Sequence, residues 1–194
     1  MPRTDTRTEI LAIARDIVAT EGLGGVSFDA IARRLGRSKQ AVLYWFPSRT
    51  ELLAALFLPW LEAEADAAIA ALTDAQAEAE ATGAFVRAIA GFHFADLERF
   101  RAMYLAPQIT RKTGPKPGPA EMTEAVHPVT DRLYHALAGH LAGRPDEARR
   151  KAAAIHAAVL GLVTMFALAD ALNDPLKHSR PDLLDALIAS FGAH

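Results

Sequence analysis

Apolar residues recur at a helical spacing along almost the whole chain. In the first segment, Ile10, Leu11, Ala14, Ile17 and Val18 fall on one stripe with a period of about 3.6 residues. Alanine-rich patterns of the same kind follow, and no segment alternates apolar and polar residues over the length of a strand. The pattern therefore predicts an all-α protein.

Glycine, proline and capping residues divide this pattern into separate helices. Ser27 and Ser38 are favourable N-caps, whereas Gly22, Gly36 and Pro47 end helices. Three short helices are thus expected before residue 48. The second and third are joined by a tight turn that contains glycine, which predicts a helix-turn-helix unit.

The remainder of the chain is expected to form longer helices. Ser48 and Glu51 have the spacing of a capping box, so a helix begins there. Gly114–Pro119 is too rich in glycine and proline to be helical and predicts a loop. The expected helices cover approximately residues 48–72, 83–106, 120–142, 146–172 and 181–191. The sequence therefore predicts two domains, a three-helix unit over residues 1–47 and a helical bundle over residues 48–194.

Composition excludes several classes of protein. The chain contains no cysteine, which excludes disulfides and cysteine-based zinc sites. The N-terminal segment lacks the apolar run of a signal peptide. The longest strongly apolar stretch, Ile155–Ala169, is shorter than the roughly 20 residues that span a membrane. A cytoplasmic protein with no membrane partner is expected.

Charge is distributed unevenly, although the formal net charge is only −2. The first 50 residues carry eight basic and five acidic side chains, whereas the rest of the chain has an acidic excess. A basic N-terminal region on an acidic body fits a polyanionic partner that binds at one end.

The helix-turn-helix suggests that this partner is double-stranded DNA. In DNA-binding units of this kind, the second helix lies in the major groove with its N-terminal residues at the base edges. Here those residues are Arg37, Ser38, Lys39 and Gln40. Arginine or lysine can donate to guanine O6 and N7, and glutamine can pair with adenine. The alternative is a solvated three-helix bundle whose basic edge is incidental.

The residues that follow are suited to the phosphate backbone. Tyr44, Trp45 and Arg49 are expected where the backbone would pass. Ser48 and the backbone amides that open the next helix favour an anion, because helix N-termini attract negative charge. The aromatic residues and the donors together fit a surface that contacts DNA better than a core or a solvated face.

Residues 10–53 resemble the N-terminal domain of the tetracycline-repressor (TetR) family. The matching positions are Ala14, Gly22, Ile31-Ala32, Gly36, Ser38-Lys39, Phe46-Pro47-Ser48 and Leu52-Leu53. The resemblance implies a homodimeric transcriptional regulator, usually a repressor. It also implies release from the operator by a small molecule that binds the C-terminal domain. Because a two-fold dimer carries two equal DNA-binding units, the expected operator is palindromic.

Several positions depart from the family pattern. The family usually has valine at Arg37, tyrosine at Leu43, histidine at Trp45 and lysine at Arg49. The change to Arg49 keeps a phosphate-binding cation. Leu43 lacks a hydroxyl that commonly contacts the DNA backbone, and the neighbouring Tyr44 is expected to replace it within the DNA-binding surface.

The last two helices are the predicted dimer interface. The helix over 146–172 is apolar almost all round, which indicates burial on all sides. In a chain of this size, one side would pack on its own core and the other on a partner subunit, as the resemblance also implies. The alternative is a monomeric core. The predicted interface residues are Ala157, Leu160, Gly161, Thr164, Leu168, Leu184, Leu187 and Phe191.

A cavity for an unidentified small-molecule effector is expected among the helices over 83–106, 120–142 and 146–172. Binding pockets are mostly apolar with a few placed polar groups. The candidate residues have this character, although such residues at helical spacing also form ordinary cores. They are Phe92, His93, Tyr104, His127, Tyr134 and Met165.

Neither a metal, a cofactor nor an enzymatic activity is expected. His135 and His140 lack the spacing of a metal pair on one helix. The hydrolase, nucleotide-binding and metalloprotease motifs are missing from the sequence. Two alternatives to a regulator stay open, a helical enzyme that uses Asp131 or His127 and a helical partner-binding protein with an incidental basic region.

Overall fold

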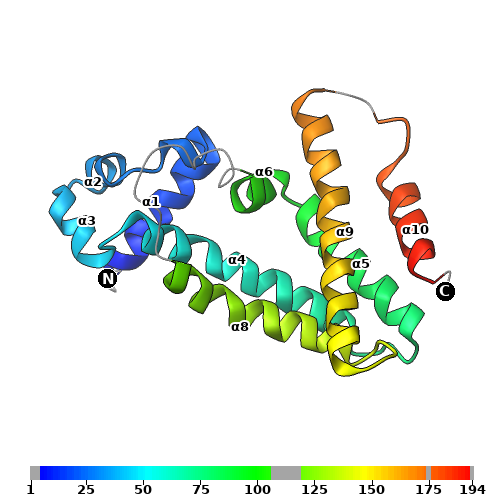
Figure 1. Cartoon of the computed structure of the whole chain (residues 1–194). Coiled ribbons are helices and arrows are strands. Elements are labelled where there is room, and N and C mark those ends of the chain that lie inside the picture. The colour runs from blue at the N-terminus through cyan, green and yellow to red at the C-terminus, as the bar shows by residue number, and fades with distance from the viewer. Residues whose placement is uncertain (1–4, 106–118, 174–175, 193–194) are drawn as a thin grey trace. The chain divides into compact units, whose positions relative to one another are not determined.

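The computed structural model describes residues 5–105, 119–173 and 176–192, and these residues are helical with short connections and no strand (Figure 1). The expected all-α class is confirmed. The elements are α1 (Thr6–Glu21), the 3-10 turn η1 (Leu23–Gly25), α2 (Phe28–Leu35), α3 (Lys39–Trp45), α4 (Arg49–Ala71), α5 (Glu78–Phe94), α6 (Leu97–Phe100), the π-helical turn η2 (Arg101–Leu105), α8 (Pro119–Ala138), α9 (Pro145–Ala171) and α10 (Arg180–Phe191). The predicted loop Gly114–Pro119 lies outside the described residues, except for its last residue.

The capping residues act in the N-terminal helices as predicted. The Ser27 side chain accepts a hydrogen bond from the Ala30 N–H at the start of α2. Gly36 ends α2 with a φ of 68°, a left-handed conformation that glycine adopts without a steric penalty. Ser38 then caps α3. The chain therefore turns sharply between α2 and α3, as a helix-turn-helix requires.

The chain forms two compact units whose boundaries differ from the predicted ones. Unit 1 comprises residues 1–61 and 98–127, and unit 2 comprises residues 62–97 and 128–194. The predicted boundary after residue 47 is too early because the first half of α4 belongs to the N-terminal core. Leu52 and Leu56 of α4 are fully buried in the same cluster as Ile10 and Ile31.

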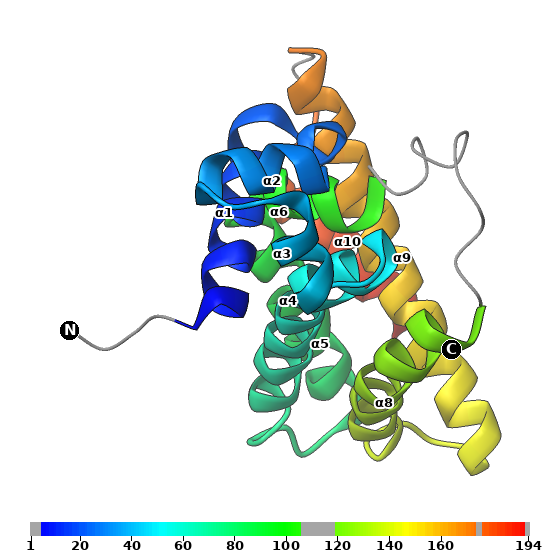
Figure 2. The same cartoon turned by 90° about the vertical axis from the view of Figure 1, so that its left-hand side faces the viewer.

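The core of unit 1 joins α1, α2, α3 and the start of α4, and Figure 2 shows the first three of these helices grouped together. The fully buried side chains Ile10, Ile17, Ile31 and Val42 come from α1, α2 and α3. Phe46, directly after α3, is 2% exposed. This core fixes α3 against the other two helices and leaves its opposite side open.

The core of unit 2 is centred on α5, which contacts both α9 and α10. Phe85 and Ile89 of α5 are fully buried, as is Ile155 of α9. At the start of α10, the Arg180 guanidinium lies over the Phe94 ring, 4.6 Å from its centroid. This cation–π contact attaches the last helix to α5.

Helix α9 is long and apolar enough to cross a membrane by length and composition alone. Buried helices of folded proteins can have the same length and apolar composition. One side of α9 faces the interior of unit 2, where Ile155, Val159 and Val163 are fully buried. Helix α9 is therefore a core helix of unit 2.

The helix expected over 83–106 is divided in the structure. Helix α5 begins earlier, at Glu78, because the Glu80 carboxylate accepts hydrogen bonds from the N–H groups of Gln76 and Ala77. It ends at Phe94, and α6 and η2 follow. Ala95 and Asp96 therefore separate α5 from α6.

Candidate functional site

Helix α3 presents its N-terminal residues to solvent. Arg37, Ser38, Lys39 and Gln40, the predicted base-reading residues, are all exposed. They precede or open the helix, whose buried side is anchored by Val42. Unit 1 thus holds these four side chains on one rigid turn, as insertion of a helix into a major groove requires.

Two of the predicted DNA-binding side chains also cap helices. The Ser38 oxygen accepts a hydrogen bond from the Ala41 N–H at 3.3 Å, and the Ser48 oxygen accepts one from the Glu51 N–H at 3.1 Å. The Ser48 hydroxyl donates in turn to the Glu51 carboxylate at 3.0 Å. Ser38 therefore keeps its hydroxyl hydrogen for an external acceptor, whereas the hydrogen of Ser48 is engaged by Glu51.

Two large aromatic side chains of α3 are also exposed. Tyr44 is 80% exposed and Trp45 is 37% exposed, and their rings meet edge to face with centroids 5.5 Å apart. Leu43 beside them is half-buried. Tyrosine and tryptophan are enriched at contact surfaces, because each combines an apolar ring with a polar group. They lie on the same helix as the predicted base-reading residues.

The Arg49 guanidinium lies at the start of α4 and is tied to the rest of unit 1. It donates a hydrogen bond to the Leu23 carbonyl at 3.2 Å, which links α4 to the turn after α1. The residue is nevertheless exposed. Guanidinium groups carry five N–H donors, so Arg49 retains donors for a phosphate.

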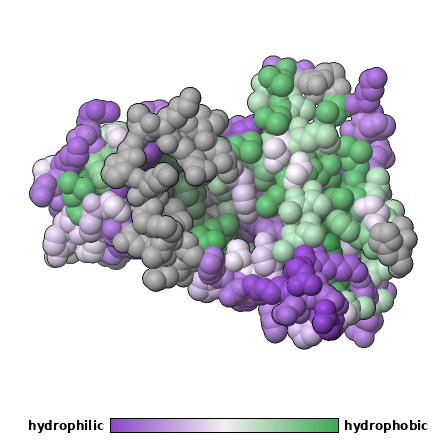
Figure 3. All heavy atoms as spheres, viewed as in Figure 1, coloured by the Kyte–Doolittle hydropathy of each residue, from purple (hydrophilic) through white to green (hydrophobic). Residues whose placement is uncertain are grey.

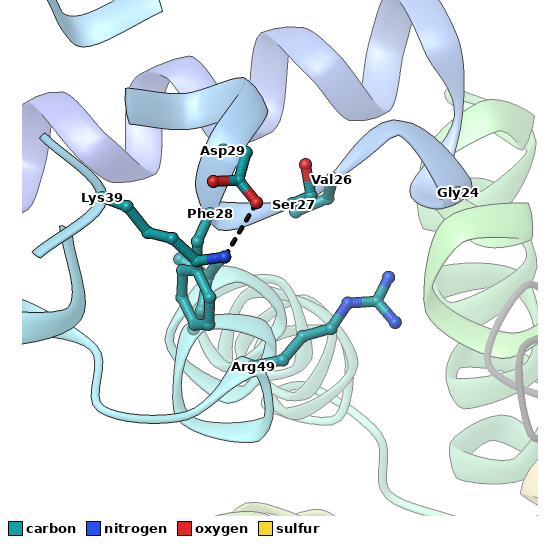
Figure 4. Close-up of a pocket in the computed structure, with 8 residues that line it drawn as sticks. Gly24, Val26, Ser27, Phe28, Asp29, Lys39 and Arg49 are labelled. Atoms are coloured by element: carbon teal, nitrogen blue, oxygen red, sulfur yellow. Dashed lines mark hydrogen bonds and ion pairs between the residues drawn. The ribbon is translucent and has the colours of Figure 1, made fainter. Parts of the chain in front are cut away.

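Sequence reasoning missed an acidic residue in this region. The Lys39 ammonium forms an ion pair with the Asp29 carboxylate of α2 at 2.8 Å. The pair borders an open hollow of about 440 Å³, and Figure 4 shows Asp29, Lys39 and Arg49 around it. The hollow is lined by Gly24, Val26, Ser27, Phe28, Asp29, Lys39, Arg49 and Leu52.

Unit 2 carries an apolar surface on α9. Met165 is 39% exposed, Leu168 is 53% exposed and Leu172, just after the helix, is 76% exposed. The space-filling view shows apolar residues gathered over α9 (Figure 3). Among the predicted interface residues, Ala157, Gly161 and Leu168 are exposed, whereas the half-buried ones are Leu160, Thr164, Leu184, Leu187 and Phe191.

A buried polar cluster lies inside unit 2. Glu64 of α4 is 1% exposed, and its carboxylate lies 2.9 Å from His156 Nε2 and 3.4 Å from His93 Nε2. The Tyr134 hydroxyl lies 3.1 Å from His156 Nδ1. Since an ionised carboxylate only accepts, His156 donates through Nε2 to Glu64. Its other ring nitrogen, Nδ1, faces the Tyr134 hydroxyl.

The surroundings determine the charge of this cluster. Burial by itself raises the pKa of Glu64, but hydrogen bonds from His156 and His93 and the attraction of both imidazoles outweigh burial and lower the pKa to about 2. Burial and the Glu64 charge raise the pKa of Tyr134, so its hydroxyl keeps its proton. At neutral pH the cluster therefore contains an ionised carboxylate held by imidazole groups.

Three of the six predicted effector-binding residues lie close to one another in unit 2. His93 and Tyr134 are connected through Glu64 and His156, and the Phe92 ring lies edge to face with His93, with centroids 5.3 Å apart. Met165 is partly exposed on α9, whose buried side is formed by other residues. The remaining two, Tyr104 and His127, belong to unit 1.

Sequence reasoning missed Glu64 and His156, although a signal for each was present. Glu64 lies four and eight residues before Ala68 and Leu72, so it occupies the apolar stripe of its helix. His156 lies between Ile155 and Val159 on the buried side of α9. Within the described residues, no group of three His, Cys, Asp or Glu side chains could hold a metal ion.

Comparison with known proteins agrees with the helix-turn-helix. Residues 10–56 match the family model described as "Bacterial regulatory proteins, tetR family". The matched segment runs from α1 into the first half of α4 and so covers the core of unit 1. No curated protein sequence matched the chain.

Solved structures show the same fold over nearly the whole chain. A transcriptional regulator from Rhodococcus sp. Rha1 is 25% identical, with 97% of this chain and 95% of that chain covered and a TM-score of 0.68. A TetR/AcrR-family regulator from Thermobifida fusca is 20% identical, with 96% of each chain covered and a TM-score of 0.58. The multidrug binding protein EbrR, complexed with imidazole, is 21% identical, with 95% of each chain covered and a TM-score of 0.56. The chain thus has the fold of TetR-family transcription regulators.

Proposed function

From the premise that residues 10–56 form a domain of the tetR family of bacterial regulatory proteins, we propose that the protein is a cytoplasmic repressor. It binds a palindromic operator as a dimer and is released by a small molecule. The family and the fold support the coarser statement, a DNA-binding transcription regulator without enzymatic activity. The dimer, the repression and the release are the additional parts of the proposal.

The observation that carries the proposal is the exposed side of α3. It combines four polar side chains at the helix start with two exposed aromatic rings on a rigidly packed unit. Bases are read by Arg37, Lys39 and Gln40, while Tyr44, Trp45 and Arg49 contact the backbone. In a two-fold dimer, the two copies of α3 would enter major grooves on one face of the duplex, about 34 Å or a multiple apart.

The dimer is proposed to form through α9 and α10. A continuous apolar surface that is exposed on one chain marks a protein–protein contact. Ala157 and Gly161 allow close approach of two α9 helices because their side chains are small. The exposed Leu168 would become the buried centre of such a contact.

The effector is proposed to bind in unit 2 near the cluster of Glu64, His93, Tyr134 and His156. A few polar groups among buried aromatic residues are typical of binding pockets, and Phe85 lies edge to face with His156, with centroids 6.1 Å apart. The related fold of EbrR, a multidrug binding protein, supports a ligand-binding role for this unit. Native mass spectrometry of the protein as purified from cells would detect a retained ligand. The operator affinity of the protein is then measured with and without that ligand. A ligand that leaves the operator affinity unchanged would contradict the proposal.

DNA binding is tested by selecting duplexes from a random-sequence library with the wild-type protein. We expect enrichment of a palindromic site and a binding constant that falls steeply as salt is raised, because phosphate contacts release counterions. The absence of enrichment, together with salt-independent binding, would contradict the proposed function.

Replacement of Gln40 and of Arg49 should have different effects on binding to the enriched site. Gln40→Ala is expected to cost about 1–3 kcal/mol on that site and to relax the preference at one base position. Arg49→Ala is expected to weaken binding to all sequences alike and to reduce the salt slope by about one unit per chain. Salt titrations of both variants on the enriched and a scrambled duplex measure the difference. Equal loss of specificity in the two variants would contradict these roles.

A further inference from the structure

We infer that Asp29 is a specificity-determining residue, because it neutralises Lys39 on DNA that lacks the preferred bases. This inference rests on the proposed DNA-binding function. It adds that the Asp29 carboxylate competes with DNA for the side chain of Lys39, one of the base-reading residues. Asp29 itself need not contact a base. It acts by holding the Lys39 ammonium until a better set of acceptors replaces its carboxylate.

The geometry places the two groups in a direct ion pair. Asp29 lies in the first turn of α2 and Lys39 is the first residue of α3, and their charged atoms are 2.8 Å apart. Figure 4 shows the Lys39 side chain directed back towards the Asp29 carboxylate. Because α2 and α3 pack on the same core, the pair is preset by the fold and does not depend on a partner.

The exposure of the pair makes it reversible. The Lys39 side chain is 51% exposed and that of Asp29 is 68% exposed. Exposed ion pairs are weak, because water screens them and two side chains must be held in one geometry. DNA can therefore separate Lys39 from Asp29, whereas a buried pair would hold the lysine permanently.

The same weak pair affects random and preferred DNA differently. A free lysine binds any phosphate as a compact cation, and each phosphate it neutralises adds sequence-independent affinity. With Asp29 beside it, Lys39 brings no net charge to a random sequence. At a guanine, O6 and N7 supply two acceptors in the major groove that can replace the carboxylate. Asp29 therefore lowers non-specific affinity more than specific affinity.

Asp29 can be replaced without disturbing the packing of unit 1. Its side chain is exposed, and the N-cap of α2 is Ser27, two residues earlier. Asparagine keeps the size and removes the charge. Asp16→Asn is the matched control, because it removes the same charge from an exposed site in the same unit, where Asp16 pairs with Arg34. Arg34 also keeps a second carboxylate partner, Glu21.

The experiment compares wild type, Asp29→Asn and Asp16→Asn by fluorescence anisotropy on two 30-bp duplexes, one enriched by the wild-type protein and one of random sequence. At about 0.1 M salt we expect Asp29→Asn to bind the random duplex roughly tenfold more tightly, with a salt slope steeper by about one unit per chain. The affinity for the enriched duplex should rise by a smaller factor. The affinity ratio, enriched duplex over random duplex, should therefore fall. Asp16→Asn should leave the ratio unchanged.

A second background separates the ion pair from general charge repulsion. In a Lys39→Met protein, Asp29→Asn should no longer change the affinity ratio, because the cation that it releases is missing. Two results would overturn the inference and leave the DNA-binding function intact. The first is that Asp29→Asn changes the affinity ratio equally in the wild-type and the Lys39→Met protein. The second is that its effect is no larger than that of Asp16→Asn. If the wild-type protein enriches no duplex, the proposed function itself fails.

Discussion

Replacing Glu64 by alanine is expected to lower the free energy of unfolding by about 3–5 kcal/mol, the cost of removing one partner from a buried charged network. The carboxylate is 1% exposed and lies within 3.4 Å of ring nitrogens of both His93 and His156. Without it, two imidazoles in the interior of unit 2 lose an acceptor that water cannot replace. The measurement is urea unfolding followed by circular dichroism at pH 7.

Glu62→Ala is the control for this substitution. Glu62 lies two residues earlier on the same helix, and its side chain is exposed. Exposed substitutions of this kind usually change the stability by less than about 0.5 kcal/mol. If the Glu64 and Glu62 variants lost the same stability, the cluster would not stabilise unit 2.

The same residue should give the protein an acid-sensitive component of stability. The pKa of Glu64 is lowered from 4.5 to about 2 in the folded state, so the unfolded chain binds the proton more readily. The stabilisation is therefore fully present above about pH 4.5 and is lost as the pH falls towards 2, by about 3 kcal/mol in total. A Glu64→Gln variant should show a shallower fall over this window than wild type or Glu62→Gln.

Leu168→Glu is expected to convert a dimer into a monomer, with a dissociation constant at least about 100-fold higher. Leu168 is 53% exposed on one chain and lies on the proposed contact surface of α9. An isologous dimer contains the substitution twice, so two unpaired carboxylates would be buried in an apolar interface. Sedimentation velocity at micromolar concentration measures the change.

Ala70→Glu provides the comparison for the dimer. Ala70 is an exposed residue of α4, so the new charge stays in water and sedimentation should be unchanged. Operator affinity should fall for Leu168→Glu alone, because a monomer carries a single α3. A wild-type protein that sediments as a monomer would contradict the proposed interface.

The helices could be predicted from the sequence because their signals are local. Ser27, Gly36 and Ser38 act within a few residues of their own positions, and the structure has the corresponding helix ends. The position of the exposed residues at the start of α3 could be predicted from the same capping residues. Local signals of this type specify the turn between α2 and α3 almost completely.

The remaining features depend on contacts between distant segments. The pair of Asp29 and Lys39 joins residues ten apart, and Glu64 reaches His156 across 92 positions. The core of unit 1 extends to Leu56, which a boundary placed at Pro47 could not include. The apolar pattern of one helix predicts which side of that helix is buried. It does not predict which side chains of another helix the buried residues contact.

The exposed indole of Trp45 makes α3 observable by fluorescence. The chain has two tryptophans, and Trp60 of α4 is half-buried beside Phe57, with ring centroids 5.7 Å apart. An indole in water emits at longer wavelength than one in an apolar environment, so the two residues should contribute separable bands to the emission spectrum. In a Trp60→Phe protein, all remaining tryptophan emission would come from α3. Quenching by iodide, and its suppression by a bound duplex, would then report the occupancy of this helix without any label.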